Sequence, residues 1–214
     1  MPWNGTGGFD GRVRMVSLGA TQSRIFKEGN PMSRLSSFDP DNMSPEQKAV
    51  YDKIASGPRG SVRGPFEKLL VNPAVADGVQ AMGATLRFGG TLPANLRELA
   101  ILVTARHWTS QYEWYAHAPI ALKGGLAEPI LEAIKQRRRP SFVDPNEAVV
   151  YEFCNELHEK RDVSDETYEW AVENLGESGV AELIGLCGHY TLISMTLNVG
   201  RVNLPDGEEL PLKP

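Results

Sequence analysis

The segment LRELAILVTARHWTSQYEWYAHAPIALKGG, residues 96–125, decides the expected fold. A helix opens at Pro93 and places apolar residues at helical spacing, with Leu96, Leu99, Ala100 and Val103 on one side. A second helix is expected over 110–123, where a pair of glycines ends it. Two successive helices of this length can fold back on each other as a helical hairpin.

Helical patterns continue on both sides of this segment. Toward the N-terminus, Ser44, Pro45 and Gln47 combine an N-cap, a first-turn proline and a capping-box glutamine. Helices are expected from that cap to the loop 57–64, and then over 66–71, 73–88, 93–108, 110–123, 128–135, 145–160, 164–175 and 178–199. No run alternates with period two for long enough to predict a strand. The expected fold class is therefore all-α, with about eight helices.

The two ends of the chain differ from its middle. Residues 1–31 hold six glycines and show no sustained period, which is typical of a flexible N-terminal tail. We therefore expect a single all-α domain over 32–204, followed by a C-terminal tail over 205–214.

Composition argues against several classes of protein. A chain of 214 residues that is 41% hydrophobic can bury one sizeable core, and its net charge of −5 argues against a general nucleic-acid binder. Two cysteines are too few for a disulfide framework, which favours a reducing, cytoplasmic setting. No signal peptide is visible. The apolar stretch 180–199 contains Glu182, His189 and Asn198, so we expect a buried helix there and no membrane span.

Three ionisable residues interrupt the apolar pattern of the segment 96–125: Glu98, Glu113 and His117. Glu113 and His117 are four residues apart and share one helix face, and a hairpin would let Glu98 face them. A carboxylate beside an imidazole fixes its tautomer and raises its pKa, which prepares a general acid/base. A helical Glu–His pair is also common on surfaces, where it contributes only a few tenths of a kcal/mol. The pattern alone leaves both interpretations open.

Aromatic residues around these three predict a small pocket. Tyr112, Trp114 and Tyr115 are expected to supply its walls and hydroxyl groups, although they could equally belong to the core. Pro119 has no backbone N–H, so a kink there would open space beside His117.

The residue that binds a substrate carboxylate is less certain from spacing. Arg97 and Arg106 are the candidates closer to the three ionisable residues, and Arg87 and Arg201 remain alternatives. His189, on the last helix, either lines the pocket or is a satisfied core histidine.

The letters R-E-L-A-I-L, followed after a spacer by Y-E-W-x-x-H-x-P-x-A and Gly-Gly, resemble the carboxymuconolactone decarboxylase and alkylhydroperoxidase-D (AhpD) superfamily over residues 92–133. A weaker resemblance extends to GHYTLISMTLNV in the last helix. The redox branch of that family carries a glutamate and then C-x-x-C-x-x-x-H. Aligned on Glu98 and His117, the two cysteine positions fall on Ser110 and Glu113, which cannot form a disulfide. The resemblance is therefore to the decarboxylase-like subgroup.

This resemblance implies an AhpD-like helical-hairpin bundle, a homo-oligomer such as a trimer or hexamer, and proton transfer without a metal or organic cofactor. The substrate would be a small organic acid or lactone, such as an aromatic breakdown product. His117 would be the general acid/base, Glu113 its orienting partner and Glu98 a second proton carrier. The same three residues could hold a divalent metal, but the resemblance favours a metal-free site. A peroxidase and a non-catalytic ligand-binding oligomer are the alternatives.

Cys154 and His158 form a C-x-x-x-H pattern on another helix, with no second cysteine in that motif. The sequence around them is typical of an ordinary amphipathic helix. We therefore expect a buried, inert Cys154 and a surface His158. A redox role for Cys154 or Cys187 is the alternative, and it requires a thiol that reacts with peroxide.

Overall fold

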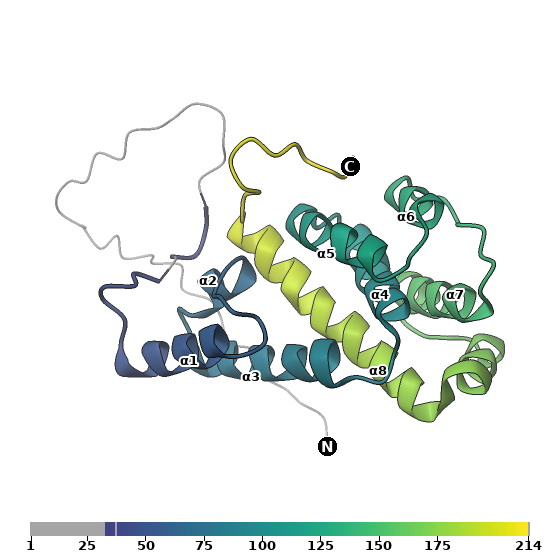
Figure 1. The fold of residues 1–214 in the computed structure, drawn as a ribbon, viewed down its shortest axis with the longest axis horizontal. Coiled ribbons are helices and arrows are strands. Elements are labelled where there is room, and N and C mark those ends of the chain that lie inside the picture. Colours follow the sequence, from purple (N-terminus) through teal and green to yellow (C-terminus); the bar gives the residue numbers. More distant parts are fainter. Residues whose placement is uncertain (1–32, 37, 214) are drawn as a thin grey trace, which may run out of the picture. The chain divides into compact units, whose positions relative to one another are not determined.

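Helix α4, Ala94–His107, organises the fold of the computed structural model, which describes residues 33–36 and 38–213. It packs against α5, α6, α7 and α8 (Figure 1). Almost every position from Leu96 to Arg106 is buried. A helix that is apolar on all sides stabilises a fold only when other helices surround it. The flexible tail expected over 1–31 lies outside the described residues.

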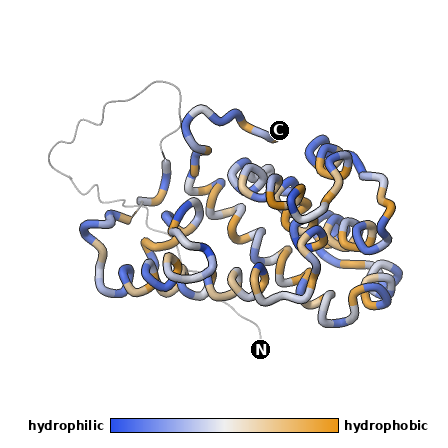
Figure 2. Tube along the Cα trace, in the orientation of Figure 1, coloured by the Kyte–Doolittle hydropathy of each residue, from blue (hydrophilic) through white to orange (hydrophobic). Residues whose placement is uncertain are grey.

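The described residues form eight α-helices and one π-helical turn, with no strands. The all-α prediction is therefore confirmed. The elements are α1 (Pro45–Ser56), α2 (Pro65–Leu69), α3 (Pro73–Ala84), η1 (Thr85–Gly89), α4, α5 (Gln111–Lys123), α6 (Glu128–Lys135), α7 (Pro145–Lys160) and α8 (Asp165–Gly200). Figure 2 shows the apolar residues concentrated on α4 and along α8.

Helix starts follow the capping residues in the sequence. Ser44 and Gln47 form the expected capping box of α1, and Asn72, Asp144 and Ser164 each accept a backbone hydrogen bond at the start of a helix. Helix α4 has no capping side chain of its own. The Glu182 carboxylate of α8 accepts hydrogen bonds from Thr91 and Leu92, just ahead of α4. This contact ties the start of α4 to α8.

Two helices differ from the predicted pattern. The helix expected over 73–88 ends at Ala84 and continues as the π-helical turn η1, which carries Arg87. The two helices expected over 164–175 and 178–199 are joined within α8, which is broken at Gly176 (φ 70°, ψ 167°). Only glycine adopts this conformation without strain, so Gly176 separates the two segments much as predicted.

The segment 205–213, expected to be a C-terminal tail, is mostly exposed and irregular, and it is anchored to the domain near its end. Leu212 is buried, and its backbone exchanges two 2.9 Å hydrogen bonds with the Gln111 side chain. Arg106 also donates to the carbonyl oxygen of Lys213 at 2.9 Å. These contacts hold the segment against the start of α5.

Helix α8 is, by length and composition alone, long and apolar enough to cross a membrane, and half of its most apolar window is buried inside the fold. Core helices of soluble proteins have the same property. The inner face buries Leu183, Leu186 and Ile193, as expected for the stretch 180–199. The outer face exposes Ile184 and Met195.

Candidate functional site

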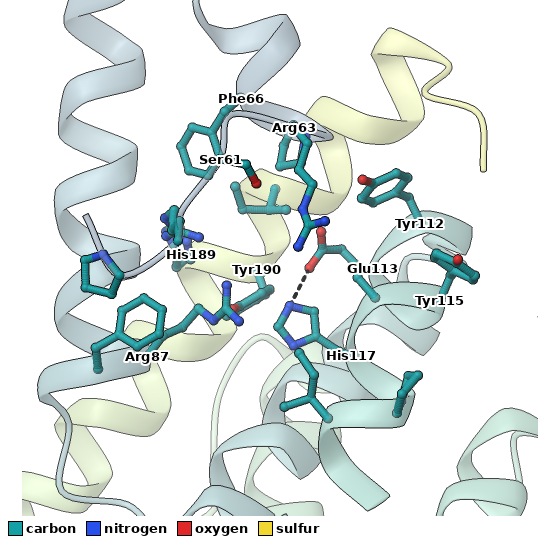
Figure 3. Close-up of a pocket in the computed structure, with 18 of the residues that line it drawn as sticks. Ser61, Arg63, Phe66, Arg87, Tyr112, Glu113, Tyr115, His117, His189 and Tyr190 are labelled. Carbon is teal, nitrogen blue, oxygen red and sulfur yellow. Dashed lines mark ion pairs between the residues drawn. The ribbon is translucent and has the colours of Figure 1, made fainter. Parts of the chain in front are cut away.

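The hairpin of α4 and α5 brings together the three ionisable residues that the sequence singled out. His117 Nδ1 lies 2.7 Å from Glu98 Oε2, within hydrogen-bond distance across the two helices. His117 Nε2 lies 3.4 Å from Glu113 Oε2, one turn earlier on α5 (dashed in Figure 3). All three side chains are buried. The imidazole is therefore placed between two carboxyl groups, and the predicted hairpin contact is confirmed.

Glu98 is held as a carboxylate. Burial on its own raises the pKa of Glu98, but the hydrogen bond from His117 and the positive charges of His117, Arg87 and Arg97 outweigh it, so the pKa is lowered. Because an ionised carboxylate only accepts hydrogen bonds, Nδ1 of His117 must carry the proton that points at Glu98. This leaves Nε2 as the ring atom that faces Glu113.

Glu113 has the opposite electrostatic environment. Burial raises the pKa of Glu113, and the charges of His117, Arg87 and Arg59 offset this only in part. Its Oε2 atom is buried and makes no hydrogen bond. A buried carboxyl group with a raised pKa, placed beside an imidazole, is suited to take up and release a proton.

A cavity of about 630 Å³ opens in front of Glu113 and His117. Its walls come from the loop 58–65, from η1, and from α5 and α8. Its polar and aromatic lining consists of Arg59, Ser61, Arg63, Phe66, Arg87, Phe88, Tyr112, Glu113, Tyr115, His117, His189 and Tyr190. A cavity of this size suits a small organic molecule.

Three arginines make this cavity strongly cationic: Arg59, Arg63 and Arg87. In Figure 3 the side chains of Arg63 and Arg87 point into the space in front of Glu113 and His117. Nε and one terminal nitrogen of Arg59 are buried without a hydrogen-bond partner. Burial, and then the charge of Arg87, lower the pKa of Arg59. Unpaired buried guanidinium nitrogens are costly, so an anionic ligand would relieve this arrangement.

His189 and Tyr190 of α8 close the cavity beside the arginines. Burial, and then the charges of Arg59, Arg87 and His117, lower the pKa of His189 to about 4, so this imidazole is neutral at physiological pH. Burial raises the pKa of Tyr190, which keeps its hydroxyl protonated. The rings of His117 and His189 both meet Tyr190 edge-on, with centroids 5.1 Å apart in each pair. The neutral side chains of His189 and Tyr190 can take part in hydrogen bonds without adding charge.

The other predicted site residues divide into two groups. Tyr112, Tyr115 and His189 line the cavity as predicted. Trp114 does not, because it lies on the opposite face of α5 and is buried in the core. Arg97 also lies outside the lining, and its Nε is 3.6 Å from Glu98 Oε1. Arg97 therefore contacts the Glu98 carboxylate without lining the cavity.

Sequence reasoning missed Arg59 and Arg63 and left Arg87 as one alternative among several. Arg59 and Arg63 lie in the loop rich in glycine and proline between α1 and α2, where no periodicity assigns a side chain to a face. The one local signal was the glycine at position 64, where φ is 62° and an added Cβ would lie 2.7 Å from the Tyr112 ring. A non-glycine residue would clash there, so Gly64 fixes the loop against α5.

His158 is another correction. It is half-buried rather than on the surface, and its Nε2 lies 2.9 Å from Thr104 Oγ1. Cys154 is buried as expected.

Within the described residues, no group of three or more histidine, cysteine, aspartate and glutamate side chains is arranged to hold a metal ion. Comparison of the chain with protein-family models and with curated proteins finds no match.

Proposed function

We propose that this chain is a cofactor-independent enzyme of the carboxymuconolactone decarboxylase type, with an AhpD-like helical-hairpin fold, that acts on a small anionic acid or lactone by proton transfer. The observation that carries the proposal is the position of His117, which sits between Glu98 and Glu113 at the wall of a cationic cavity. The resemblance over residues 92–133 supports the same reaction class.

The contacts favour distinct roles for the two glutamates. Glu98 makes the shorter contact with His117 and has a lowered pKa, which suits an orienting carboxylate. Glu113 has a raised pKa and lines the cavity, which suits a proton carrier. This reverses the assignment expected from spacing, where Glu113 orients the ring, because the hairpin contact is shorter than the contact one turn along α5.

The proposed reaction needs one proton and one electron sink. When a carboxylate next to an activated carbon leaves as carbon dioxide, the electrons of the broken C–C bond remain on the substrate as an enolate. His117 delivers a proton to the carbon that lost the carboxylate, and Glu113 returns a proton to the imidazole. Positioned acid–base catalysis of this kind contributes typically about 10²–10⁴-fold in rate.

The arginines suit the charge that persists through the reaction. A guanidinium that binds only the departing carboxylate stabilises the ground state and slows its loss. Arg59 and Arg87 would assist the reaction by binding a second carboxylate that the substrate retains. They could also bind the enolate oxygen, where negative charge grows in the transition state. We therefore expect a substrate with at least one anionic group besides the one that is lost.

Homo-oligomerisation and a cytoplasmic location complete the proposal. The apolar outer face of α8 supports a contact between copies of this chain, and a trimer or hexamer is the expected assembly. A small-molecule substrate is the expected partner, with no nucleic acid and no membrane involved.

The test measures carbon dioxide release from a panel of carboxylated lactones and β-keto acids. We expect wild type to turn over at least one member and His117→Gln to lose at least about a hundredfold in kcat. His107→Gln is the matched control, because His107 is also helical and partly buried but lies outside the cavity. It should retain wild-type turnover.

Two outcomes would overturn the proposal. Undiminished turnover in folded His117→Gln would remove the proton-transfer role from His117. Tight binding of panel members without conversion by wild type would instead indicate a ligand-binding protein.

A further inference from the structure

A second group of reactive side chains lies where α7 meets α8, and the proposed reaction does not use it. Cys154 and Cys187 are the only cysteines in the chain, and both are buried free thiols. Their Sγ atoms are 3.4 Å apart, although the residues are 33 positions apart in sequence. A disulfide bond measures about 2.05 Å, so bond formation requires the two sulfurs to move closer together.

Two side chains activate one thiol of this pair. His158 and Thr104 lie close enough to Cys187 to lower the pKa of its thiol, and His158 adds positive charge beside it. His158 Nε2 in turn lies 2.9 Å from Thr104 Oγ1. A thiol beside a histidine is in the environment that favours thiolate formation.

As a result, the pKa values of the two thiols are shifted in opposite directions. The hydrogen bond between the two thiols, followed by the proximity of His158 and Thr104, lowers the pKa of Cys187 despite its burial. The contact with Cys187 and burial raise the pKa of Cys154 well above its usual range. One sulfur is suited to attack an oxidant, and the other is suited to remain a thiol until a sulfur electrophile forms beside it.

A small cavity reaches His158, the residue beside Cys187. This cavity of about 210 Å³ is lined by His158 together with His107, Tyr151 and Arg106. A water molecule takes up roughly 30 Å³ in the liquid, so molecules of the size of hydrogen peroxide fit easily. Neither cysteine lines the cavity, so an oxidant that enters it would reach Cys187 through movement of the His158 ring.

We infer that Cys154 and Cys187 form a redox-active dithiol site between α7 and α8, which small hydroperoxides oxidise to a disulfide. The site stands apart from the cavity of His117 and lies on other residues than the C-x-x-C positions of the redox branch, Ser110 and Glu113. The expectation of an inert Cys154 is replaced by this inference, because that cysteine has a sulfur partner, Cys187, which lies beside the activating histidine.

The chemistry balances with hydrogen peroxide as the oxidant. The Cys187 thiolate attacks one peroxide oxygen, the O–O bond breaks, and the leaving hydroxide takes a proton from the His158 imidazolium to form water. Cys187 is then a sulfenic acid. The sulfur of Cys154 attacks Cys187, the S–O bond breaks, and hydroxide leaves with the Cys154 proton as a second water. Two thiols lose two electrons, the peroxide gains them, and an external dithiol reductant restores the reduced pair.

The experiment follows intact mass during titration of the folded chain with hydrogen peroxide. Wild type should lose the mass of two hydrogens and regain it with dithiothreitol. Cys154→Ser should instead gain one oxygen at Cys187, trapped by a sulfenic-acid reagent such as dimedone. Cys187→Ser should remain unmodified under the same conditions, because its remaining thiol has lost the activated partner.

His158→Gln tests the activating contact without removing a sulfur. Disulfide formation should slow by about tenfold or more, since an unassisted thiol is mostly protonated at neutral pH. His189→Gln, a buried histidine of the other cavity, is the control and should oxidise at the wild-type rate. Circular dichroism of each variant establishes that it is folded.

The inference fails if wild type keeps its mass in millimolar peroxide while both thiols still react with a thiol reagent after unfolding in guanidinium. Equal oxidation of wild type and His158→Gln would also overturn the role of the histidine.

Discussion

Glu98 and Glu113 are the same residue type, and both lie within 3.4 Å of one imidazole, but their surroundings drive their pKa values in opposite directions. A hydrogen bond from His117 and flanking cations hold Glu98 ionised. Burial dominates for Glu113. Paired carboxyl groups with separated pKa values are how a site holds a proton acceptor and a proton donor at one pH.

Sequence reasoning at this scale recovered the triad and missed its cationic partners. The spacing of Glu113 and His117 fixes their shared face because a helix repeats every 3.6 residues. The same rule should have separated Trp114 from its neighbours, since consecutive residues on a helix point in different directions. Arg59 lies in a loop, where no repeat predicts which way a side chain points. Its place in the cavity depends on tertiary contacts alone.

Acid should destabilise the protein through His189. Its pKa is lowered from 6.5 to about 4 in the folded chain, so the unfolded chain binds the proton more tightly. This contribution to stability is present above pH 6.5 and is lost as pH falls through 4. Between those limits the wild type should lose about 3 kcal/mol more unfolding free energy than His189→Gln. Urea unfolding at a series of pH values measures the difference, and parallel curves for the two proteins would contradict it.

Gly83 of α3 provides the space that Arg59 and His189 occupy. A Cβ atom there would lie 2.4 Å from a terminal nitrogen of Arg59 and 2.6 Å from His189 Nε2. Gly83→Ala should therefore displace both side chains and weaken binding of an anionic ligand by about tenfold, on the order of 1.4 kcal/mol. Titration calorimetry with a panel dicarboxylate measures this.

The matched control is Gly78→Ala on the same helix, where a Cβ meets no atom within 4 Å. It should leave ligand affinity unchanged and stabilise α3 by about 0.5–1 kcal/mol. Equal affinities for wild type and Gly83→Ala would contradict the positions given to Arg59 and His189.

At the scale of elements, helix boundaries were predictable where a local signal sets them. The start of α1 follows from Ser44 and Gln47, and α6 and α7 begin and end at the predicted residues. The π-helical turn η1 has no such signal, because an extra residue in a turn is set by packing on neighbouring helices. The anchoring of Leu212 and Lys213 had no local signal for the same reason, since it depends on Gln111 and Arg106.

The break at Gly176 should be intolerant of a side chain. With φ 70° and ψ 167°, the backbone lies in a region that is essentially restricted to glycine, although no atom lies within 4 Å of an added Cβ. Gly176→Ala should therefore cost about 1–3 kcal/mol of unfolding free energy through backbone strain alone. Chemical denaturation compares it with Gly78→Ala, which has equal space and helical backbone. If Gly176→Ala has the unfolding free energy of wild type, the two segments of α8 can join with another backbone conformation.

At the scale of the whole molecule, α8 presents an outer stripe of exposed residues without charge. The stripe consists of Ile184, Gly188, Leu192, Met195 and Val199, which recur at helical spacing. On the other face the same helix supplies His189 and Tyr190 to the cavity. Self-association through this stripe would therefore place a subunit contact one helix thickness from the site.

A charge in this stripe should dissociate the proposed oligomer. Ile184→Glu and Met195→Glu each place a carboxylate where a contact between copies would bury it, at a cost of several kcal/mol per buried unpaired charge. Light scattering coupled to size-exclusion chromatography should show a smaller mass than for wild type. Val143→Glu, a fully exposed loop position, is the control and should keep the wild-type mass. A monomeric wild type would contradict self-association.

The most direct test of the central claim is deuterium incorporation in heavy water, using the panel substrate that wild type converts. If His117 protonates the carbon that loses its carboxylate, the product carries one deuterium there. The rate of its appearance should fall at least about a hundredfold in His117→Gln while substrate still binds. The Cys154→Ser/Cys187→Ser double variant should incorporate deuterium at the wild-type rate. Undiminished incorporation by folded His117→Gln, or its loss in the cysteine double variant, would contradict proton transfer at His117.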